Sequence, residues 1–312
     1  MMKGYVWVLL LAMTSMECVA GLSEGAKAYN VKDYQTAFKE FSPLATNGHA
    51  AAQFVLGGMY YYGDGVPKNY SQAADWYRKA AAQGHSSAQF LLGGMYYSGE
   101  GVPKNYSQAV DWYRKAAAQG DADAQYKLGL MYDNGLGVPK NYSQAADWYR
   151  KAAEQGNAAA QFVLGSMYRT GEGVPQNYSQ AVDWYRKAAA QGDADAQNML
   201  GRMYYEGKGV PQNYSQAADL YRKAGTRGHS DALNNLGAGY EFGQFGAENL
   251  VLAYIFYNLA AVNGDEKFKK NRDDITPKLT SAELNKAQKI ASQWVIGQPL
   301  PQYNSSHKTN QK

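Results

Sequence analysis

Cysteine, proline and long apolar segments are all scarce in this sequence. Cys18 is the single cysteine among 312 residues, so a disulfide within the chain is excluded and stability must come from packing. Beyond the first twenty residues, no apolar run approaches the roughly 20 residues that span a bilayer. Apolar residues nevertheless make up 45% of the chain, which excludes a disordered chain and favours a folded protein with a sizeable core.

An excess of charge of one sign is also missing. The 31 lysines and arginines are nearly matched by 27 aspartates and glutamates, giving a net charge of +4, and the two signs are interleaved along the chain. The sequence has no basic tract of the kind that neutralises phosphates, and it has no acidic tail. We therefore expect no nucleic-acid partner.

The first twenty residues have the layout of a secretory signal peptide. MMKG carries a positive charge, YVWVLLLAM is apolar, and ECVA supplies small residues before Gly21. We predict a signal peptide at residues 1–20 with cleavage after Ala20, which leaves no stable membrane span. Lipid attachment at Cys18 is an alternative, although Glu17 stands where a small residue is preferred. The mature protein is therefore expected to be exported, either to the periplasm or as a secreted protein.

A period of 36 residues dominates the rest of the chain. The period defines six full units at residues 49–264, and a shorter unit at 21–48 keeps the same register. We predict that the shorter unit is a partial repeat that caps the N-terminal end. The repeating positions are Pro67, Pro103, Pro139, Pro175 and Pro211, and Leu56, Leu92, Leu128, Leu164, Leu200 and Leu236.

Each unit predicts two helices separated by a tight loop. Gly63 and Pro67 favour the loop, and Asn69 is a typical N-cap for the second helix. We further expect Trp76 to fill the space between units, and Asp75 to pair with Lys79 one helical turn later. The apolar residues with helical spacing are Ala52, Leu56, Met59 and Tyr60, and then Ala73, Tyr77, Ala80 and Ala81.

A helix pair of this length cannot bury its apolar stripe alone, so the units must stack on one another. The repeated pattern is A-x-x-x-L-G-x-x-Y-x-x-G-x-G-V-x-x-[ND]-Y-x-x-A-x-x-W-Y-x-x-A-A-x-x-G. It resembles the Sel1-like repeat, a relative of the tetratricopeptide repeat, over residues 21–296. The resemblance implies an all-α fold, an α/α superhelical solenoid of 36-residue helix hairpins. It also implies an exported bacterial scaffold that binds another protein or peptide, and we expect it to be a monomer.

The last full unit needs a cover because its second helix, LVLAYIFYNLAAV, is apolar on nearly every side. Helices within residues 265–296 are predicted to form this C-terminal cap, and Thr280 and Glu283 have the spacing of a capping box. Residues 297–312, GQPLPQYNSSHKTNQK, have no pattern and are expected to form a disordered tail.

Two recurring motifs are explained more simply by helix capping than by glycosylation or metal binding. Five N-Y-S triplets match a glycosylation acceptor, yet all five fall at the Asn69 position of the repeat, which favours helix caps. His49, His85 and His229 occupy the first position of a unit, where aspartate or asparagine stands in other units. We interpret these histidines as helix starts rather than metal ligands, and we predict no metal site and no cofactor.

The sequence contains no recognisable arrangement of catalytic residues. Its only S-x-x-K pair, Ser305 and Lys308, lies in the predicted tail, and the acids and bases of the repeats recur on a solvated surface. We therefore predict that the protein is not an enzyme. Some secreted, cysteine-rich relatives bind or hydrolyse β-lactams, so that activity is one alternative, although the paired cysteines are missing. A periplasmic envelope-assembly or regulatory factor is another.

One face of the first helices varies between units, whereas the second helices are nearly identical. At about 100° per residue, the variable positions 54, 55, 58, 61 and 62 fall within an arc of about 120°. In helical-repeat solenoids the first helices usually line the concave surface where partners dock, so we predict a partner-binding strip there. Neutral drift on an exposed face is the alternative. The predicted strip consists of Phe54, Tyr61, Tyr62, Phe90, Tyr97, Tyr126, Asp133, Phe162, Arg169, Asn198, Arg202 and Tyr205.

Overall fold

The computed structural model describes residues 20–303, which form sixteen α-helices, α2 to α17, and two short 3-10 helices. No strand occurs among these residues, and the predicted all-α fold of paired helices is confirmed. The predicted signal peptide falls, up to residue 19, outside the described residues, as do residues 304–312. Within residues 20–303, no helix combines the length and the apolar character needed to cross a membrane.

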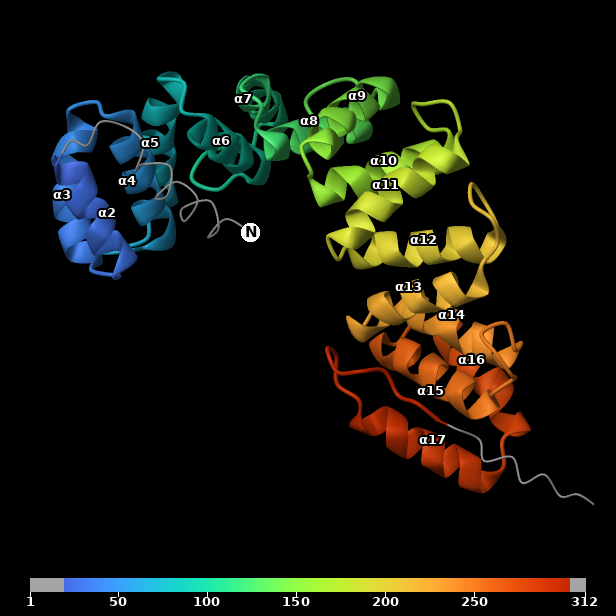
Figure 1. Ribbon diagram of the computed structural model, residues 1–312. Coiled ribbons are helices and arrows are strands. Elements are labelled where there is room, and N and C mark those ends of the chain that lie inside the picture. Colours follow the sequence, from blue (N-terminus) through green and yellow to red (C-terminus); the bar gives the residue numbers. More distant parts are fainter. Residues whose placement is uncertain (1–19, 304–312) are drawn as a thin grey trace, which may run out of the picture. The chain divides into compact units, whose positions relative to one another are not determined.

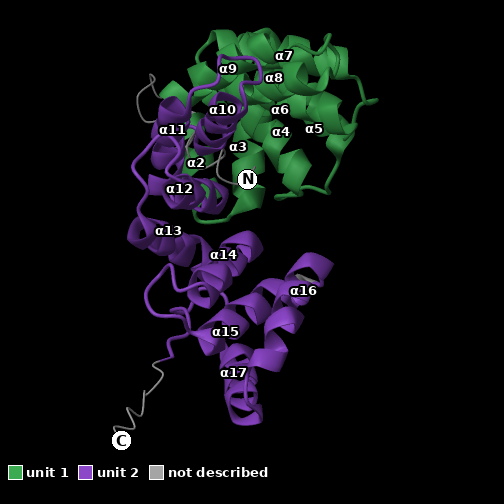
Figure 2. Ribbon diagram, turned by 90° about the vertical axis from the view of Figure 1, so that its right-hand side faces the viewer, with its two compact units in different colours: residues 1–155 green, residues 156–312 purple. Residues whose placement is uncertain are grey.

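The chain divides into two compact units, residues 1–155 and 156–312 (Figure 2). In the first unit, each hairpin packs against the next one along the chain (Figure 1). Its four hairpins are α2 (Ala20–Asn30) with α3 (Tyr34–Thr46), α4 (Ala50–Tyr62) with α5 (Tyr70–Ala82), α6 (Ser86–Ser98) with α7 (Tyr106–Ala118), and α8 (Ala122–Asn134) with α9 (Tyr142–Glu154).

The second unit holds three hairpins and a cap. Both α16 and α17 pack against α15, so the apolar second helix of the last repeat is covered by the helices that follow it. The hairpins are α10 (Ala158–Thr170) with α11 (Tyr178–Ala190), α12 (Ala194–Glu206) with α13 (Tyr214–Thr226), and α14 (Ser230–Glu241) with α15 (Leu250–Ala260). The cap consists of η2 (Ala261–Asn263), α16 (Glu266–Ile275), η3 (Thr276–Lys278) and α17 (Ser281–Gln293).

The helix ends follow the signals in the sequence. Asn69 accepts a hydrogen bond on Oδ1 from the Gln72 amide at 3.1 Å, and the equivalent asparagine begins α7, α9, α11 and α13 in the same way. His85 and His229 cap α6 and α14 through Nδ1, which confirms that these two histidines start helices. Gly63 ends α4 with φ of 80°, a left-handed conformation that glycine adopts without strain.

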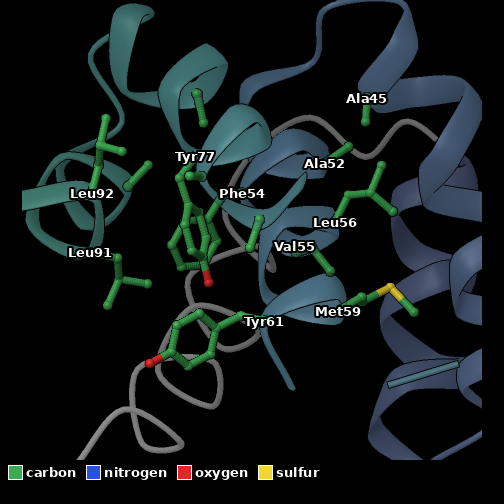
Figure 3. Close-up of a cluster of buried hydrophobic side chains, with 14 of the residues drawn as sticks. Ala45, Ala52, Phe54, Val55, Leu56, Met59, Tyr61, Tyr77, Leu91 and Leu92 are labelled. Atoms are coloured by element: carbon green, nitrogen blue, oxygen red, sulfur yellow. The ribbon is translucent and has the colours of Figure 1, made fainter. Parts of the chain in front are cut away.

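In each full repeat, a glycine in the first helix packs against a buried tyrosine of the second helix. The Tyr77 side chain is 1% exposed, and a Cβ on Gly57 would lie 2.6 Å from its ring. Because the ring fills the space that a side chain on Gly57 would occupy, the two helices approach closely. Figure 3 shows Tyr77 beside Phe54 within this cluster. The other pairs are Gly93 with Tyr113, Gly129 with Tyr149, Gly165 with Tyr185, Gly201 with Tyr221 and Gly237 with Tyr257.

Buried glutamines tie neighbouring hairpins together. Gln89 in α6 donates from Nε2 to the Ala81 carbonyl of α5 at 3.1 Å, and its Oε1 accepts from Gln119 at 2.7 Å. The role of these glutamines as links was not predicted from the sequence. The available signal was a polar residue that recurs at one position between apolar neighbours. In the first unit the same two bonds are made by Gln53 with Ala45 and Gln83, and by Gln125 with Ala117 and Gln155.

One prediction for the second helices is confirmed only in part, and another is wrong. Trp76 packs against the hydrophobic core, as Trp148 does against the cluster of the preceding repeat, but Trp76 is only half-buried and Lys79 Nζ lies 4.0 Å from its ring centroid. The core position belongs to Tyr77. Asp75 pairs with Arg78 at 2.6 Å rather than with Lys79, since Arg78 lies one turn away on the same exposed face.

The C-terminal segment packs on the second unit as far as Tyr303. The Gly297 amide donates to the Thr226 carbonyl at 2.8 Å, and Asn249 Nδ2 donates to the Tyr303 carbonyl at 3.1 Å. Leu300 packs against the hydrophobic cluster of the last repeat. The expectation of a disordered tail is therefore wrong for residues 297–303, because these contacts use backbone groups that a composition pattern does not reveal.

Candidate interaction surface

Position 54 of the repeat, predicted to be open to solvent, faces the interior. Phe54 is 1% exposed, and its ring stacks on His85 with 4.6 Å between the ring centroids. The prediction of an open strip is wrong at this residue, because this side of α4 is covered by the second helix of its own hairpin and by the start of the next repeat. Phe90, Tyr126 and Phe162 are half-buried, with ring centroids 5.8 Å from Tyr113, Tyr149 and Tyr185, respectively.

At position 54, the aromatic residue of the earlier repeats is replaced by asparagine in the last two repeats, and both asparagines are buried in the second unit. Asn198 is 8% exposed, and its Oδ1 accepts a hydrogen bond from Asn235 Nδ2 at 3.0 Å. In the next repeat, Asn234 accepts from Asn271 of α16 at 2.7 Å. The predicted exposure of Asn198 is therefore wrong. Its variation reflects a hydrogen bond between consecutive first helices and not contact with a partner.

In three repeats position 61 is a tyrosine, and its hydroxyl is hydrogen-bonded where the loop of the next repeat offers an acceptor. Tyr61 is 8% exposed and donates to Glu100 Oε2 at 2.7 Å, so its predicted exposure is also wrong. Burial, followed by the bond to Glu100, raises the pKa of Tyr61 above its usual range. Tyr205 in the second unit is half-buried and donates to Gln244 Oε1 at 2.5 Å. Beside Tyr61, the Tyr62 side chain is half-buried, and burial with the nearby Asp64 raises the pKa of Tyr62 to about 12.

Tyr97 keeps the exposure that the sequence predicted. Its side chain is 42% exposed, and its ring centroid lies 5.4 Å from that of Tyr106. The residue of the next loop that corresponds to Glu100 is Leu136, which has no acceptor for the hydroxyl. An amphipathic ring open to water on a rigid helix is the kind of residue that contributes much of the binding energy in protein interfaces.

The buried tyrosines present their hydroxyls to position 61, where the chemistry differs between repeats. Tyr149 donates to Asp133 Oδ2 at 3.3 Å, whereas the Tyr185 hydroxyl accepts from Arg169 Nε at 3.4 Å. Burial, with the nearby Asp133 carboxylate, raises the pKa of Tyr149. The hydroxyl of the same repeat tyrosine thus hydrogen-bonds a carboxylate in one repeat and a guanidinium in the next.

Charged side chains gather on α12 in the second unit. Arg202 is exposed and pairs with Glu206 at 2.5 Å, and Glu206 also pairs with Lys208 at 2.7 Å. We define the first-helix surface as those predicted strip residues that are exposed or half-buried. They are Tyr62, Phe90, Tyr97, Tyr126 and Asp133 in the first unit, and Phe162, Arg169, Arg202 and Tyr205 in the second.

The described residues hold no group of three or more histidine, cysteine, aspartate or glutamate side chains that could bind a metal ion. Ser305 and Lys308, the only S-x-x-K pair of the sequence, lie outside the described residues. Within residues 20–303, each unit by itself presents aromatic and charged side chains on its first helices, and such side chains are suited to recognition.

Comparison with known proteins agrees with this geometry. The Sel1 repeat family model matches six consecutive segments, 50–85, 86–121, 122–157, 158–193, 194–229 and 230–265. A protective antigen of uropathogenic Escherichia coli strains that displays an SLR fold is 35% identical, with a TM-score of 0.81, and the match covers 90% of this chain and 62% of the antigen. A Sel1 repeat protein from Oxalobacter formigenes is also 35% identical, with a TM-score of 0.68, and the match covers 80% of this chain and all of that protein. No curated protein matches the chain significantly.

Proposed function

We propose a function from the premise that this chain belongs to the Sel1 repeat family. In this proposal the protein is an exported scaffold that binds another protein or peptide through its first-helix surface. Sel1 repeats typically mediate protein interactions. The choice of face rests on Tyr97 of α6, whose aromatic side chain is 42% exposed. The equivalent residue of α4, Tyr61, is buried.

The distribution of side chains supports a partner with two kinds of surface. In the first unit the exposed or half-buried positions are mainly aromatic, with Phe90, Tyr97 and Tyr126. In the second unit Arg169 and Arg202 add positive charge. Aromatic residues and arginine are the types enriched at the centres of protein interfaces. We therefore propose a partner that presents an apolar patch and a separate acidic patch.

The test places a photo-crosslinking amino acid at position 97 and, separately, at position 202. Both chains should crosslink to the same polypeptide from the producing cell or its surroundings, identified by mass spectrometry. A crosslinker at Lys289, an exposed residue of α17 outside the surface, is the matched control and should not capture it. The variants Tyr97→Ala and Arg202→Ala should each weaken binding of that polypeptide at least tenfold. Undiminished binding in both variants would falsify the assignment of this face.

Export is proposed on the signal-like residues 1–20 together with the similarity to a protective antigen, since antibodies reach antigens outside the cell. Because the match spans only 62% of that antigen, its biological role is not carried over. Amino-terminal sequencing of the protein recovered from the periplasm or the medium should begin at Gly21. A chain that begins at Met1 and stays in the cytoplasm would contradict export.

A further inference from the structure

The surroundings of Tyr61 show which groups cover a tyrosine at this position of the repeat. Its hydroxyl donates to Glu100 Oε2 at 2.7 Å. The Tyr62 ring packs edge-on against the Tyr61 ring, with 5.1 Å between the ring centroids and 78° between the ring planes. One carboxylate and one aromatic ring thus help to keep Tyr61 buried.

Tyr205 in the second unit is covered by the same two kinds of group, supplied from a different part of the repeat. Its hydroxyl donates to Gln244 Oε1 at 2.5 Å, and the Phe245 ring lies edge-on with 6.3 Å between the ring centroids. Glu206 stands where the first unit has Tyr62, so the aromatic cover comes from the following loop instead of the same helix. An acceptor together with an aromatic ring is therefore what a tyrosine at this position binds.

Tyr97 has neither kind of cover among the residues that the structure describes. The position that supplies the acceptor in the next loop is Leu136, and the two positions that supply the ring elsewhere are Ser98 and Gly137. Leucine has no acceptor in its side chain, and serine and glycine have no ring. Tyr97 is nevertheless placed like the covered tyrosines, since its ring centroid lies 5.4 Å from that of Tyr106, against 4.9 Å and 5.2 Å in the other two hairpins.

A positive charge beside this tyrosine pair favours a carboxylate as the acceptor. Lys104 is exposed, and its Nζ lies 4.7 Å from the Tyr106 ring centroid. The Tyr106 hydroxyl, through a hydrogen bond, and then the nearby Tyr97 raise the pKa of Lys104 above its ordinary value. An acidic side chain that accepts from Tyr97 is attracted by this ammonium, whereas a neutral amide gains much less.

The two covered tyrosines show how this lysine position goes with the acceptor. Lys68 stands at the same position as Lys104, with its Nζ 4.6 Å from a tyrosine ring centroid, in the repeat whose acceptor is the Glu100 carboxylate. In the second unit that position is Gln212, and the acceptor there is the neutral amide of Gln244. A lysine thus accompanies a carboxylate, and a glutamine accompanies an amide.

We propose that Tyr97, Tyr106 and Lys104 form a site on the first unit for an acidic residue of a partner protein that has an aromatic residue close to it in sequence. This inference rests on the proposed function, because it names what the partner brings to the first-helix surface. The carboxylate accepts from the Tyr97 hydroxyl beside the Lys104 ammonium. The aromatic ring packs edge-on against Tyr97, as Tyr62 does against Tyr61.

The test selects peptides from a phage library of random twelve-residue sequences on the immobilised full chain. The double variant Leu136→Glu, Ser98→Tyr builds both covers into the chain, so peptides that also bind this variant are removed. The remaining peptides should be enriched in an aspartate or glutamate within two residues of an aromatic residue. The most enriched peptide, labelled with fluorescein, should bind the parent chain at least tenfold more tightly than the double variant in anisotropy titrations.

Two further changes separate the hydroxyl and the carboxylate from the rest of the contact. Replacing the acid of that peptide by its amide should weaken binding at least tenfold, and Tyr97→Phe in the chain should do the same because it removes only the hydroxyl. Tyr132→Phe is the matched control: it removes another tyrosine hydroxyl of the first unit, one bonded to Arg114 outside the first-helix surface, and it should bind the peptide as the parent does. Circular dichroism melts verify that the variants stay folded, and the comparison of acid and amide peptides needs the parent chain alone.

The inference is overturned if no peptide is enriched, if the enriched peptides lack the acidic and aromatic residues, or if the amide peptide binds as tightly as the acid. It is also overturned if the Tyr97→Phe chain binds the peptide like the parent. The proposed function survives any of these results when Tyr97→Ala still weakens binding of the crosslinked polypeptide, because that variant tests the face and not the chemistry of the hydroxyl.

Discussion

Single side chains decide how closely the helices of a hairpin approach. The glycine of the L-G pair lies directly on a buried tyrosine ring in each of the six full repeats, while the residue after it is variable. Both facts can be read from the sequence, because the first position is glycine in every full repeat and the second position differs between repeats. It does not reveal which neighbour the glycine meets, because periodicity gives a direction around one helix and not the identity of the facing residue.

Gly93 and Gly94 should therefore respond oppositely to alanine. A Cβ on Gly93 would lie 2.8 Å from the Tyr113 ring, so Gly93→Ala should lower the free energy of unfolding by about 1–3 kcal/mol through overpacking. A Cβ on Gly94 would meet only the Tyr113 hydroxyl at 3.7 Å, so Gly94→Ala should raise stability by up to about 1 kcal/mol through helix propensity. Urea denaturation of both variants checks this, and equal effects would refute the packing argument.

Gln197 shows what happens when one member of a glutamine pair is replaced. Its Nε2 donates to the Ala189 carbonyl, but its buried Oε1 has no partner in the described part of the chain, because Arg227 stands where Gln191 stands one repeat earlier. Gln191 bonds both Gln161 and the Gly156 carbonyl.

Arg227→Gln should supply the missing donor and keep the bond to the Gly192 carbonyl that Arg227 now makes. We expect the free energy of unfolding to rise by about 1 kcal/mol, the usual contribution of a satisfied hydrogen bond. Thermal melting measures it, with Arg227→Ala as the control that removes the arginine without adding the amide. A glutamine variant no more stable than the alanine variant would argue against the pairing.

Individual helices begin and end where the sequence predicts, because caps act locally. Asn69 and Gly63 are recognisable from their own chemistry and their immediate neighbours. The direction in which a helix faces was harder to predict. Variation at positions 54 and 61 suggested exposure, but Phe54 and Tyr61 are covered by neighbouring elements, and their replacements in later repeats make different contacts inside the fold.

The cap of α6 should make stability depend on pH. His85 is stacked on Phe54, and burial lowers the pKa of its imidazole below the ordinary 6.5. Because the folded-state pKa is below the unfolded one, the contribution of His85 is fully present above pH 6.5 and is lost as the pH falls below it. Protonation also removes the Nδ1 acceptor that caps Ala88.

The matched variant is His85→Asn, since Asn157 caps α10 at the same repeat position without titrating near neutral pH. Between pH 7.5 and pH 5, the parent chain should lose more unfolding free energy in urea titrations than the variant does. Carboxylates common to both chains cancel in this comparison. Parallel pH profiles would show that the buried histidine is not responsible.

Across the whole chain, the repeat period predicted the fold and the need for covers at its ends. The C-terminal cover was foreseen from the apolar character of α15, and α16 and α17 pack on it. The packing of residues 297–303 was not, because Gly297 and Tyr303 are held largely through their backbone groups. The site is the least predictable part, since a partner surface has no period of its own.

Truncation after Gly264 should expose the buried face of α15, including Ile255 and Leu259. We expect this chain to aggregate or to melt at a clearly lower temperature, because an uncovered terminal repeat loses its solvent-compatible face. A chain ending at Tyr303 retains the cover and should behave like the full-length protein in size-exclusion chromatography. Equal behaviour of the two truncated chains would show that α16 and α17 are dispensable.

The glutamine links also bear on how such a protein changes over generations. A junction made by Gln89, Ala81 and Gln119 is the same junction as one made by Gln125, Ala117 and Gln155, so it does not depend on which copies it joins. Duplication or loss of one whole 36-residue unit would join the same three side chains again and would need no new kind of contact. Array length is thus the heritable variable that this architecture alters most readily.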